Sequence, residues 1–206
     1  MDEQAKQAKA DFLKYTKNHS LKVVVDDGVN RHITFNHNDE IEYAFTITTW
    51  RYHLCIGGDF GTYVFSRTED MFRFFRGRTD IHPCYWGEKL VSNSTFRGHK
   101  EFSEEVFNTA VKDHFDYMIE DDEEYSEEDR AKLWEEIKEQ VLDPFDETSA
   151  IDSLTNFTTD YDFDFIDLNA SFDDYTISYL ICLHAIVAII SKYDEYKADS
   201  LEKIAS

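Results

Sequence analysis

Acidic and aromatic residues alternate at positions 160–167, where the chain reads DYDFDFID. Such carboxylates could ligate calcium, because an EF-hand loop has acids at positions 1, 3 and 5, glycine at 6 and glutamate at 12. Counted from Asp160, position 6 is Phe165 and position 12 is Ser171. Two defining positions therefore fail, and no metal site is expected here.

The alternation instead predicts a β-strand at 161–167 with its aromatic side chains turned inward. Its outward face would carry Asp160, Asp162 and Asp164. Aspartate is disfavoured in strands, and a row of it is repulsive unless a cationic partner neutralises it. The same row could also protect a sheet edge from aggregation. Both interpretations of the segment stay open.

A second acidic stretch, called the acidic run, is EDDEEYSEED at residues 120–129, with eight acids in ten residues. Runs of this kind are usually solvated loops. Here two predicted helices that carry more acids flank it, and a helix pair so charged could approach the charge density of DNA. We therefore expect an acidic, nucleic-acid-mimicking face. Its candidate residues are Glu120, Asp121, Asp122, Glu123, Glu124, Glu127, Glu128, Asp129, Glu135, Glu136, Asp160, Asp162 and Asp164.

Other motifs with catalytic meaning fail on their context. The D-F-G in GGDFG (57–61) lacks the remaining kinase elements, and a hairpin turn explains it. The eight histidines are dispersed without zinc-ligand spacing, and His82 with Cys84 forms only an unspecific Cys–His pair. We expect no catalytic residue, no metal and no cofactor, so the chain is predicted not to be an enzyme. The alternative is a metal-dependent hydrolase whose clustered aspartates converge in a cleft.

The elements that must position these residues are strands followed by helices. Alternation and turn signals predict strands at 21–25, 31–35, 41–49, 52–56 and 62–66. Helical spacing and capping residues predict helices at 3–17, from 68 to Gly77, and at 85–91, 104–119, 127–142, 146–154 and 175–197. The expected fold is α+β, an antiparallel meander of four to five strands packed by helices.

Charge is distributed unevenly over what we expect to be a single domain, residues 1–206. Residues 1–100 hold 13 acids and 14 bases, whereas residues 101–206 hold 30 acids and seven bases. The second half is thus a strongly acidic, mainly helical part beside a near-neutral one. A halophilic protein would spread its acids over the whole surface, and this chain does not. We therefore favour a negatively charged face that binds a positively charged partner over acids that serve only solubility.

The segment 67–100 is locally basic, with seven Lys and Arg among aromatic residues. Direct nucleic-acid binding is disfavoured because the net charge of −22 opposes it. Internal ion pairs with the acidic half, or self-association of basic and acidic faces into a homodimer, explain the segment better.

No secretion or membrane signal is recognised. The N-terminal stretch MDEQAKQAKADFLKY has no apolar core, and the longest apolar run, 179–190, is twelve residues. Three distant cysteines favour free thiols in a reducing cytoplasm.

Three stretches carry a resemblance: TTWRYHLCIGGDFGTYVFSR (48–67), DMFRFFR (70–76) and YWGEKL (85–90). They are similar to a group of uncharacterised proteins encoded by tailed phages and prophages, which share W…HLCI-x-GD-x-G-x-YVFSR, D-M-F-x-F-F-R and Y-W-x-E-K-L elements. The likeness covers about a fifth of the chain and carries no catalytic motif. It implies a phage protein acting in the cytoplasm of a bacterial host, where small acidic proteins often resemble anti-restriction or anti-CRISPR proteins.

Charge and resemblance together lead to one expected function. The chain would be a non-enzymatic inhibitor of a host defence nuclease, a CRISPR effector or another nucleic-acid-binding complex. Its partner would be a protein with a basic, nucleic-acid-binding surface, and neither nucleic acid nor a membrane. A phage structural or assembly factor is the further alternative.

Overall fold

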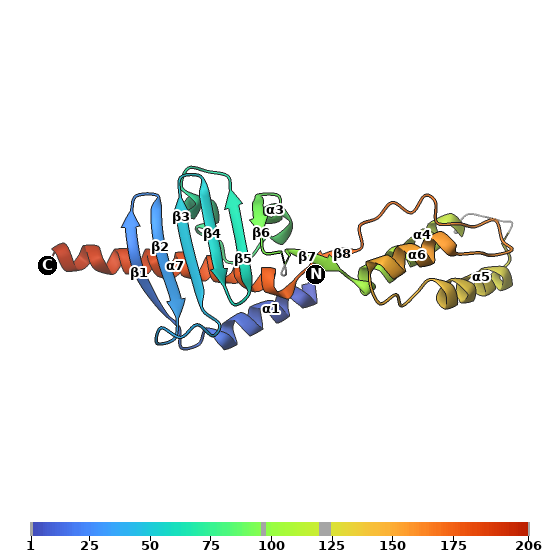
Figure 1. Cartoon of the computed structure of the whole chain (residues 1–206), viewed down its shortest axis with the longest axis horizontal. Coiled ribbons are helices and arrows are strands. Elements are labelled where there is room, and N and C mark those ends of the chain that lie inside the picture. The colour runs from blue at the N-terminus through green and yellow to red at the C-terminus, as the bar shows by residue number, and fades with distance from the viewer. Residues whose placement is uncertain (1, 96–97, 120–124, 206) are drawn as a thin grey trace. The chain divides into compact units, whose positions relative to one another are not determined.

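The computed structural model describes residues 2–95, 98–119 and 125–205. Its backbone contacts divide the chain into two compact units, called unit 1 and unit 2 (Figure 1). Unit 1 is formed by Met1–Lys100 and Tyr175–Ser206, and unit 2 by Glu101–Asp174. The sequence predicts one domain whose character changes at residue 100. The structure has a division there, and it also returns the C-terminal helix to unit 1, so unit 2 is inserted in the sequence of unit 1.

Unit 1 is built on a six-stranded antiparallel sheet in the order β1-β2-β3-β4-β5-β6. Its strands are β1 (Ser20–Asp27), β2 (Asn30–Asn36), β3 (Phe45–Trp50), β4 (His53–Gly58), β5 (Gly61–Ser66) and β6 (Leu90–Asn93). Alternation produces one buried face: Ile33 and Phe35 on β2 are buried, while Thr34 between them is only half-buried. Glycine permits the two-residue turn between β1 and β2, because Gly28 there has a φ of +60°.

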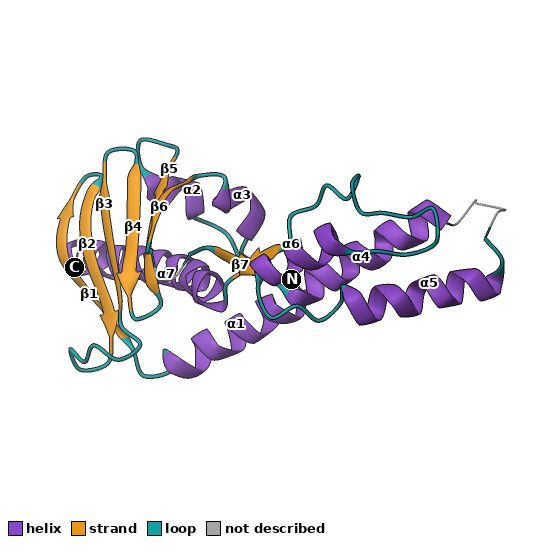
Figure 2. Ribbon diagram, turned by 45° about the vertical axis from the view of Figure 1, so that its right-hand side comes forward, coloured by secondary structure: helices purple, strands orange, loops and turns teal. Residues whose placement is uncertain are grey.

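Four helices complete unit 1: α1 (Asp2–Tyr15), α2 (Met71–Phe75), α3 (Pro83–Gly87) and α7 (Ile177–Ala205). The long helix α7 contacts α1, α2, β1 and β5 and passes along the sheet (Figure 2). Its Leu180, Leu183, Ile186 and Ile189 are fully buried in the core. By length and composition α7 could also cross a membrane, and more than half of its most apolar window is buried inside the structure. Packing in the core of unit 1 accounts for those apolar residues.

Arg31 is a buried cation that ties these elements together. Its side chain is 8% exposed, and its guanidinium donates to both carboxylate oxygens of Asp70 at 2.9 and 3.0 Å. The guanidinium carbon lies 4.6 Å from the ring centre of Phe72. A second carboxylate, that of Asp26, lies 3.9 Å away and accepts a 2.7 Å hydrogen bond from the Tyr193 hydroxyl. Arg31 on β2 therefore links β1, α2 and α7.

Unit 2 is mainly helical. It contains α4 (Glu104–Ile119), α5 (Glu127–Gln140) and α6 (Glu147–Asn156), followed by an irregular segment. A two-stranded sheet of β7 (Lys100–Phe102) and β8 (Asp173–Tyr175) lies where the chain enters and leaves this unit. A separate apolar cluster holds the unit together. Its buried members are Phe107, Val111, Phe115, Ile119, Leu133, Ile137, Val141, Ala150, Phe163 and Phe165.

The predicted α+β class with an antiparallel meander is confirmed, with six strands in the main sheet instead of four to five. The strand expected at 41–49 begins only at Phe45. The reason is local, because Tyr43 has a φ of +56° and its amide donates to the Asp59 carboxylate at 2.6 Å. The helix expected at 85–91 is shorter and earlier, and Leu90–Asn93 instead adds β6 to the sheet edge.

Candidate acidic interaction surface

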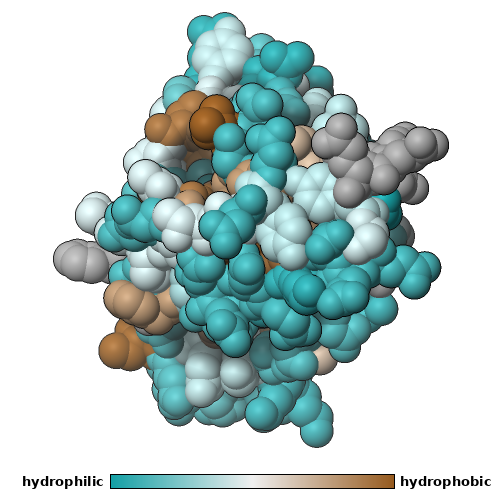
Figure 3. Space-filling view, turned by 90° about the vertical axis from the view of Figure 1, so that its right-hand side faces the viewer, coloured by the Kyte–Doolittle hydropathy of each residue, from teal (hydrophilic) through white to brown (hydrophobic). Residues whose placement is uncertain are grey.

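All of the net charge of the chain belongs to unit 2. Residues 101–174 contain 26 Asp and Glu against four Lys and Arg, a net charge of −22. The remaining residues, which make up unit 1, contain 17 acids and 17 bases and are neutral. The face drawn in Figure 3 is mostly hydrophilic, with a few separate apolar patches. The structure therefore concentrates the charge more sharply than the division at residue 100 does.

The few cations of unit 2 are engaged within it. Arg130 donates through Nε to the Tyr125 carbonyl oxygen at 3.2 Å. The three lysines form ion pairs along their own helices. These pairs are Lys112 with Asp116, Lys132 with Glu128 at 2.8 Å and Lys138 with Glu135 at 2.7 Å. Four cations cannot neutralise so many acids, so most of these carboxylates present uncompensated charge to solvent.

Acids at the start of α5 have a local structural role. The Ser126 hydroxyl accepts from the Asp129 amide at 3.2 Å, and the Asp129 carboxylate accepts from the Ser126 amide at 3.3 Å, which completes a capping box. A hydrogen bond from the Ser126 hydroxyl also lowers the pKa of Asp129. Glu127 and Glu128 lie in the same first turn, where the helix dipole favours negative charge. These carboxylates therefore help to start the helix that presents them.

The strand predicted at 161–167 is wrong, although the predicted alternation of burial is present. Phe163 and Phe165 are each 7% exposed, and Asp160, Asp162 and Asp164 are exposed. Within the part of the chain that the structure describes, no strand pairs with this segment. Local backbone hydrogen bonds, from the Phe163 amide to the Tyr161 carbonyl oxygen and from the Leu168 amide to that of Phe165, satisfy its backbone together with side-chain contacts. This is the physical reason that period-two burial occurs here without a sheet.

Two of these backbone contacts come from neighbouring side chains. His114 of α4 donates through Nε2 to the Asp164 carbonyl oxygen at 3.0 Å, and the Tyr125 hydroxyl donates to the Asp162 carbonyl oxygen at 2.9 Å. The Asp164 carboxylate itself accepts from the Ile166 amide at 3.0 Å, as in an Asx turn. Asp164 thus shapes its own loop as well as adding charge.

The structure brings the 160–162 stretch and helix α5 together. The Thr159 hydroxyl donates to the Glu136 carboxylate at 2.6 Å, and the Tyr161 hydroxyl donates to that of Asp129 at 3.4 Å. Glu135, the residue before Glu136, is exposed and forms an ion pair with Lys138 of the same helix. The two acidic stretches found separately in the sequence therefore contribute to one surface. Predicted residues Glu120, Asp121, Asp122, Glu123 and Glu124 lie outside the described residues.

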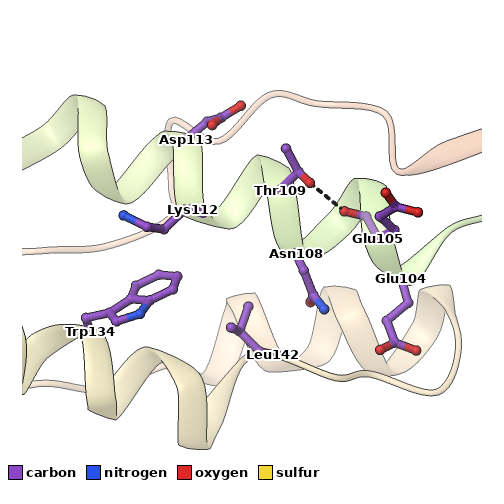
Figure 4. A pocket seen from close by; sticks show the side chains of 8 residues that line it. All are labelled: Glu104, Glu105, Asn108, Thr109, Lys112, Asp113, Trp134 and Leu142. Atoms are coloured by element: carbon purple, nitrogen blue, oxygen red, sulfur yellow. Dashed lines mark hydrogen bonds between the residues drawn. The ribbon is translucent and has the colours of Figure 1, made fainter. Parts of the chain in front are cut away.

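A groove between α4 and α5 is not predicted by the sequence. Two adjoining depressions of about 730 and 530 Å³ share Lys112 and Trp134 in their linings. Figure 4 shows the side chains that line the larger of these two. The Lys112 ammonium lies 4.9 Å from the Trp134 ring centre and 5.0 Å from that of Phe115. Trp134 is half-buried and therefore still accessible. In the sequence it lies in the apolar stripe of a predicted helix, which indicates core and gives no signal of a groove.

Within the described ranges, no group of three or more His, Cys, Asp or Glu side chains is arranged to hold a metal ion. The free thiol of Cys55 is half-buried, and this burial raises its pKa, which disfavours the reactive thiolate.

Comparison with models of protein families, with curated proteins and with solved structures finds no match for this chain.

Proposed function

We propose that the chain is a non-enzymatic inhibitor that binds a basic, nucleic-acid-binding surface of another protein through unit 2. One observation carries this proposal, namely that the whole net charge of −22 lies in an inserted unit while unit 1 is neutral. Acids needed only for solubility would have no reason to be confined in this way. Unit 1, with its sheet and its buried Arg31 cluster, is the folded unit whose sequence unit 2 interrupts.

The charge density of α5 supports mimicry of a nucleic-acid strand. This helix carries six carboxylates in 14 residues. At about 1.5 Å per residue its length is about 21 Å, so its carboxylates alone number about one per 3.5 Å, and Arg130, Lys132 and Lys138 reduce its net charge to −3. A strand of B-DNA carries one phosphate per roughly 3.4 Å. Asp160 and Asp162, held beside α5 by the Tyr161 and Tyr125 contacts, add charge to the same surface.

The expected mechanism is electrostatic and steric. An acidic surface accelerates association with a basic partner, and salt weakens that attraction because it screens exposed charges. Occupation of the basic surface would exclude the nucleic acid that normally binds there. The resemblance of residues 48–90 to phage and prophage proteins suggests a bacterial cytoplasmic target such as a defence nuclease or a CRISPR effector.

The proposal is tested by affinity capture from a bacterial host lysate at low and high salt, with mass spectrometry of the bound proteins. One variant neutralises exposed acids of unit 2 whose carboxylates form neither an ion pair nor a capping hydrogen bond within the described residues: Glu127→Gln, Asp160→Asn and Asp162→Asn. A matched control removes the same charge from exposed sites of unit 1: Glu40→Gln, Glu195→Gln and Asp199→Asn. We expect nucleic-acid-binding proteins to be captured at low salt by the native chain and the control, and less by the unit 2 variant. Equal capture by both variants, or no basic protein at low salt, would contradict the proposal.

A further inference from the structure

The groove between α4 and α5 has the geometry of a docking site for a third helix. Its lining residues on α4 include a row with three- and four-residue spacing at Glu105, Asn108, Lys112, Asp116 and Ile119, with Glu104, Thr109, Asp113 and Phe115 beside that row. This is one continuous face of a helix. On α5, Trp134 lies three residues after Ala131 and four after Arg130, so these residues share one face. Rows of this spacing on two neighbouring helices leave a furrow into which the side-chain ridge of another helix can pack.

The composition of the groove selects the charge of its occupant. Its floor and walls include the rings of Trp134 and Phe115 and the side chain of Leu142. The rim is acidic along the first depression, where Glu104, Glu105 and Asp113 outnumber Lys112, whereas Asp116 lines the second depression together with Lys112 and Arg130. Apolar floor and acidic rim together match an amphipathic segment whose apolar face is bordered by basic residues. The net charge of unit 2 acts in the same direction.

Lys112 indicates where a cation of the occupant would bind. Its ammonium lies over both aromatic rings of the groove and is paired with Asp116. The Trp134 and Phe115 rings are themselves in contact, with centroids 4.9 Å apart. Faces of aromatic rings attract cations, and a guanidinium stacks on them better than an ammonium does. The site therefore already holds a cation from its own chain, which an arginine from a partner can displace.

From this geometry we infer that the groove binds a cationic amphipathic α-helix of the partner protein, with an arginine stacked on Trp134. The lined face of α4 runs from Glu104 to Ile119. At about 1.5 Å per residue this is about 22 Å, enough for a helix of four turns. The inference rests on the proposed function, and it adds that shape and apolar contact, in addition to charge, select the partner.

The test uses two synthetic peptides of identical Leu and Arg composition. In the first, leucines recur with helical spacing and form an amphipathic helix; in the second, the same residues are rearranged so that no apolar face forms. Binding of each labelled peptide to the full chain is measured by fluorescence anisotropy at about 0.15 M salt. We expect the first peptide to bind at least about tenfold more tightly than the second, a difference of about 1.4 kcal/mol.

Three variants that leave the net charge unchanged locate the binding. Ala131→Phe fills the groove from an exposed position, and Trp134→Leu removes the ring. Ala170→Phe adds the same ring to an exposed loop position and is the matched control. We expect the first two to weaken binding of the amphipathic peptide at least about tenfold and the control to leave it unchanged. Circular dichroism verifies the fold, and Ala131→Phe decides the result if Trp134→Leu does not fold.

The outcomes separate this inference from the proposed function. Equal binding of both peptides, with no effect of Ala131→Phe, would show attraction by charge alone; the groove inference would fail while the proposed function stands. The inference is also overturned if neither peptide binds. Failure of the affinity capture and its charge variants bears on the proposed function instead, because those variants leave the groove intact.

Discussion

Replacement of Arg31 by methionine is the sharpest test of how unit 1 is held together. The substitution keeps an unbranched apolar stem of similar length and removes the charge. It leaves the Asp70 carboxylate, whose side chain is 15% exposed, without its two charged hydrogen bonds. It also removes the cation over the Phe72 ring. The perturbation therefore isolates a buried anion beside α2.

The expected loss of stability is large. Hydrogen bonds to charged groups contribute about 1.5–3 kcal/mol each, and removal of one partner of a buried ion pair costs about 3–5 kcal/mol in total. We therefore expect Arg31→Met to lower the free energy of unfolding of unit 1 by about 3–5 kcal/mol. The matched control is Arg51→Met, because Arg51 forms an exposed ion pair with Glu69 at 3.1 Å. Such surface pairs contribute about 0–1 kcal/mol.

Acid should reduce the difference between native chain and variant. Burial acts to raise the pKa of Asp70, but the hydrogen bonds from Arg31 and from the Phe72 amide more than offset it, so the pKa lies below its ordinary 3.8. Its contribution to stability is therefore complete above pH 3.8 and lost as the pH falls through the lowered native pKa. In Arg31→Met the Asp70 side chain keeps its burial but loses its main counter-charge. Protonation of Asp70 then removes the cost of this unpaired charge, so acid reduces the stability difference between the variant and the native chain.

Urea unfolding, followed by circular dichroism and tryptophan emission, measures the free energy of unfolding of the native chain and both variants at about pH 7 and about pH 3. We expect a difference of about 3–5 kcal/mol at the higher pH that shrinks at the lower one. A loss below about 1 kcal/mol, equal to that of Arg51→Met, would refute the assignment of Arg31 as a buried structural cation. A loss that does not change with pH would refute the role given to Asp70.

Three further predictions concern single side chains. Burial lowers the pKa of His184 below 6.5. The unfolded chain therefore binds more protons than the native chain, and the free energy of unfolding should fall as the pH drops below that value. His184→Gln should flatten this decline, measured by urea unfolding at about pH 7.5 and pH 5.5. Ser126→Ala removes the capping box of α5 and should destabilise unit 2 by about 0.5–2 kcal/mol in thermal unfolding, and an unchanged transition would contradict the cap. Lys112→Met removes the cation over Trp134 and should tighten binding of the amphipathic Leu/Arg peptide several-fold by anisotropy, whereas weaker binding would contradict displacement of Lys112.

Much of the fold is predictable because local patterns and tertiary packing agree. The meander follows from alternation between turns, and α5 follows from Ser126, Asp129 and an apolar stripe ending at Val141. Helix α7 follows from a long apolar run that a six-stranded sheet can bury. In these segments, hydrogen bonds within a helix or between strands that are neighbours in sequence satisfy the backbone. Each element then needs only an apolar surface to pack against, so the local sequence is enough to predict it.

The errors occur where side chains from distant residues replace regular backbone bonding. Phe163 and Phe165 alternate as in a strand, yet the carbonyl oxygens of Asp162 and Asp164 accept from the side chains of Tyr125 and His114. The positive φ of Tyr43 likewise depends on a hydrogen bond to Asp59, 16 residues later. The return of α7 to unit 1 and the opening between α4 and α5 are properties of long-range packing, which no local pattern reports.

Competition with nucleic acid tests the central claim most directly. A protein captured through unit 2 would be saturated with its own labelled nucleic acid, and the full chain added at low and at high salt. We expect the native chain and the control Glu40→Gln/Glu195→Gln/Asp199→Asn to displace the nucleic acid at low salt, and Glu127→Gln/Asp160→Asn/Asp162→Asn to displace it less well. A stable ternary complex of chain, captured protein and nucleic acid would contradict the account.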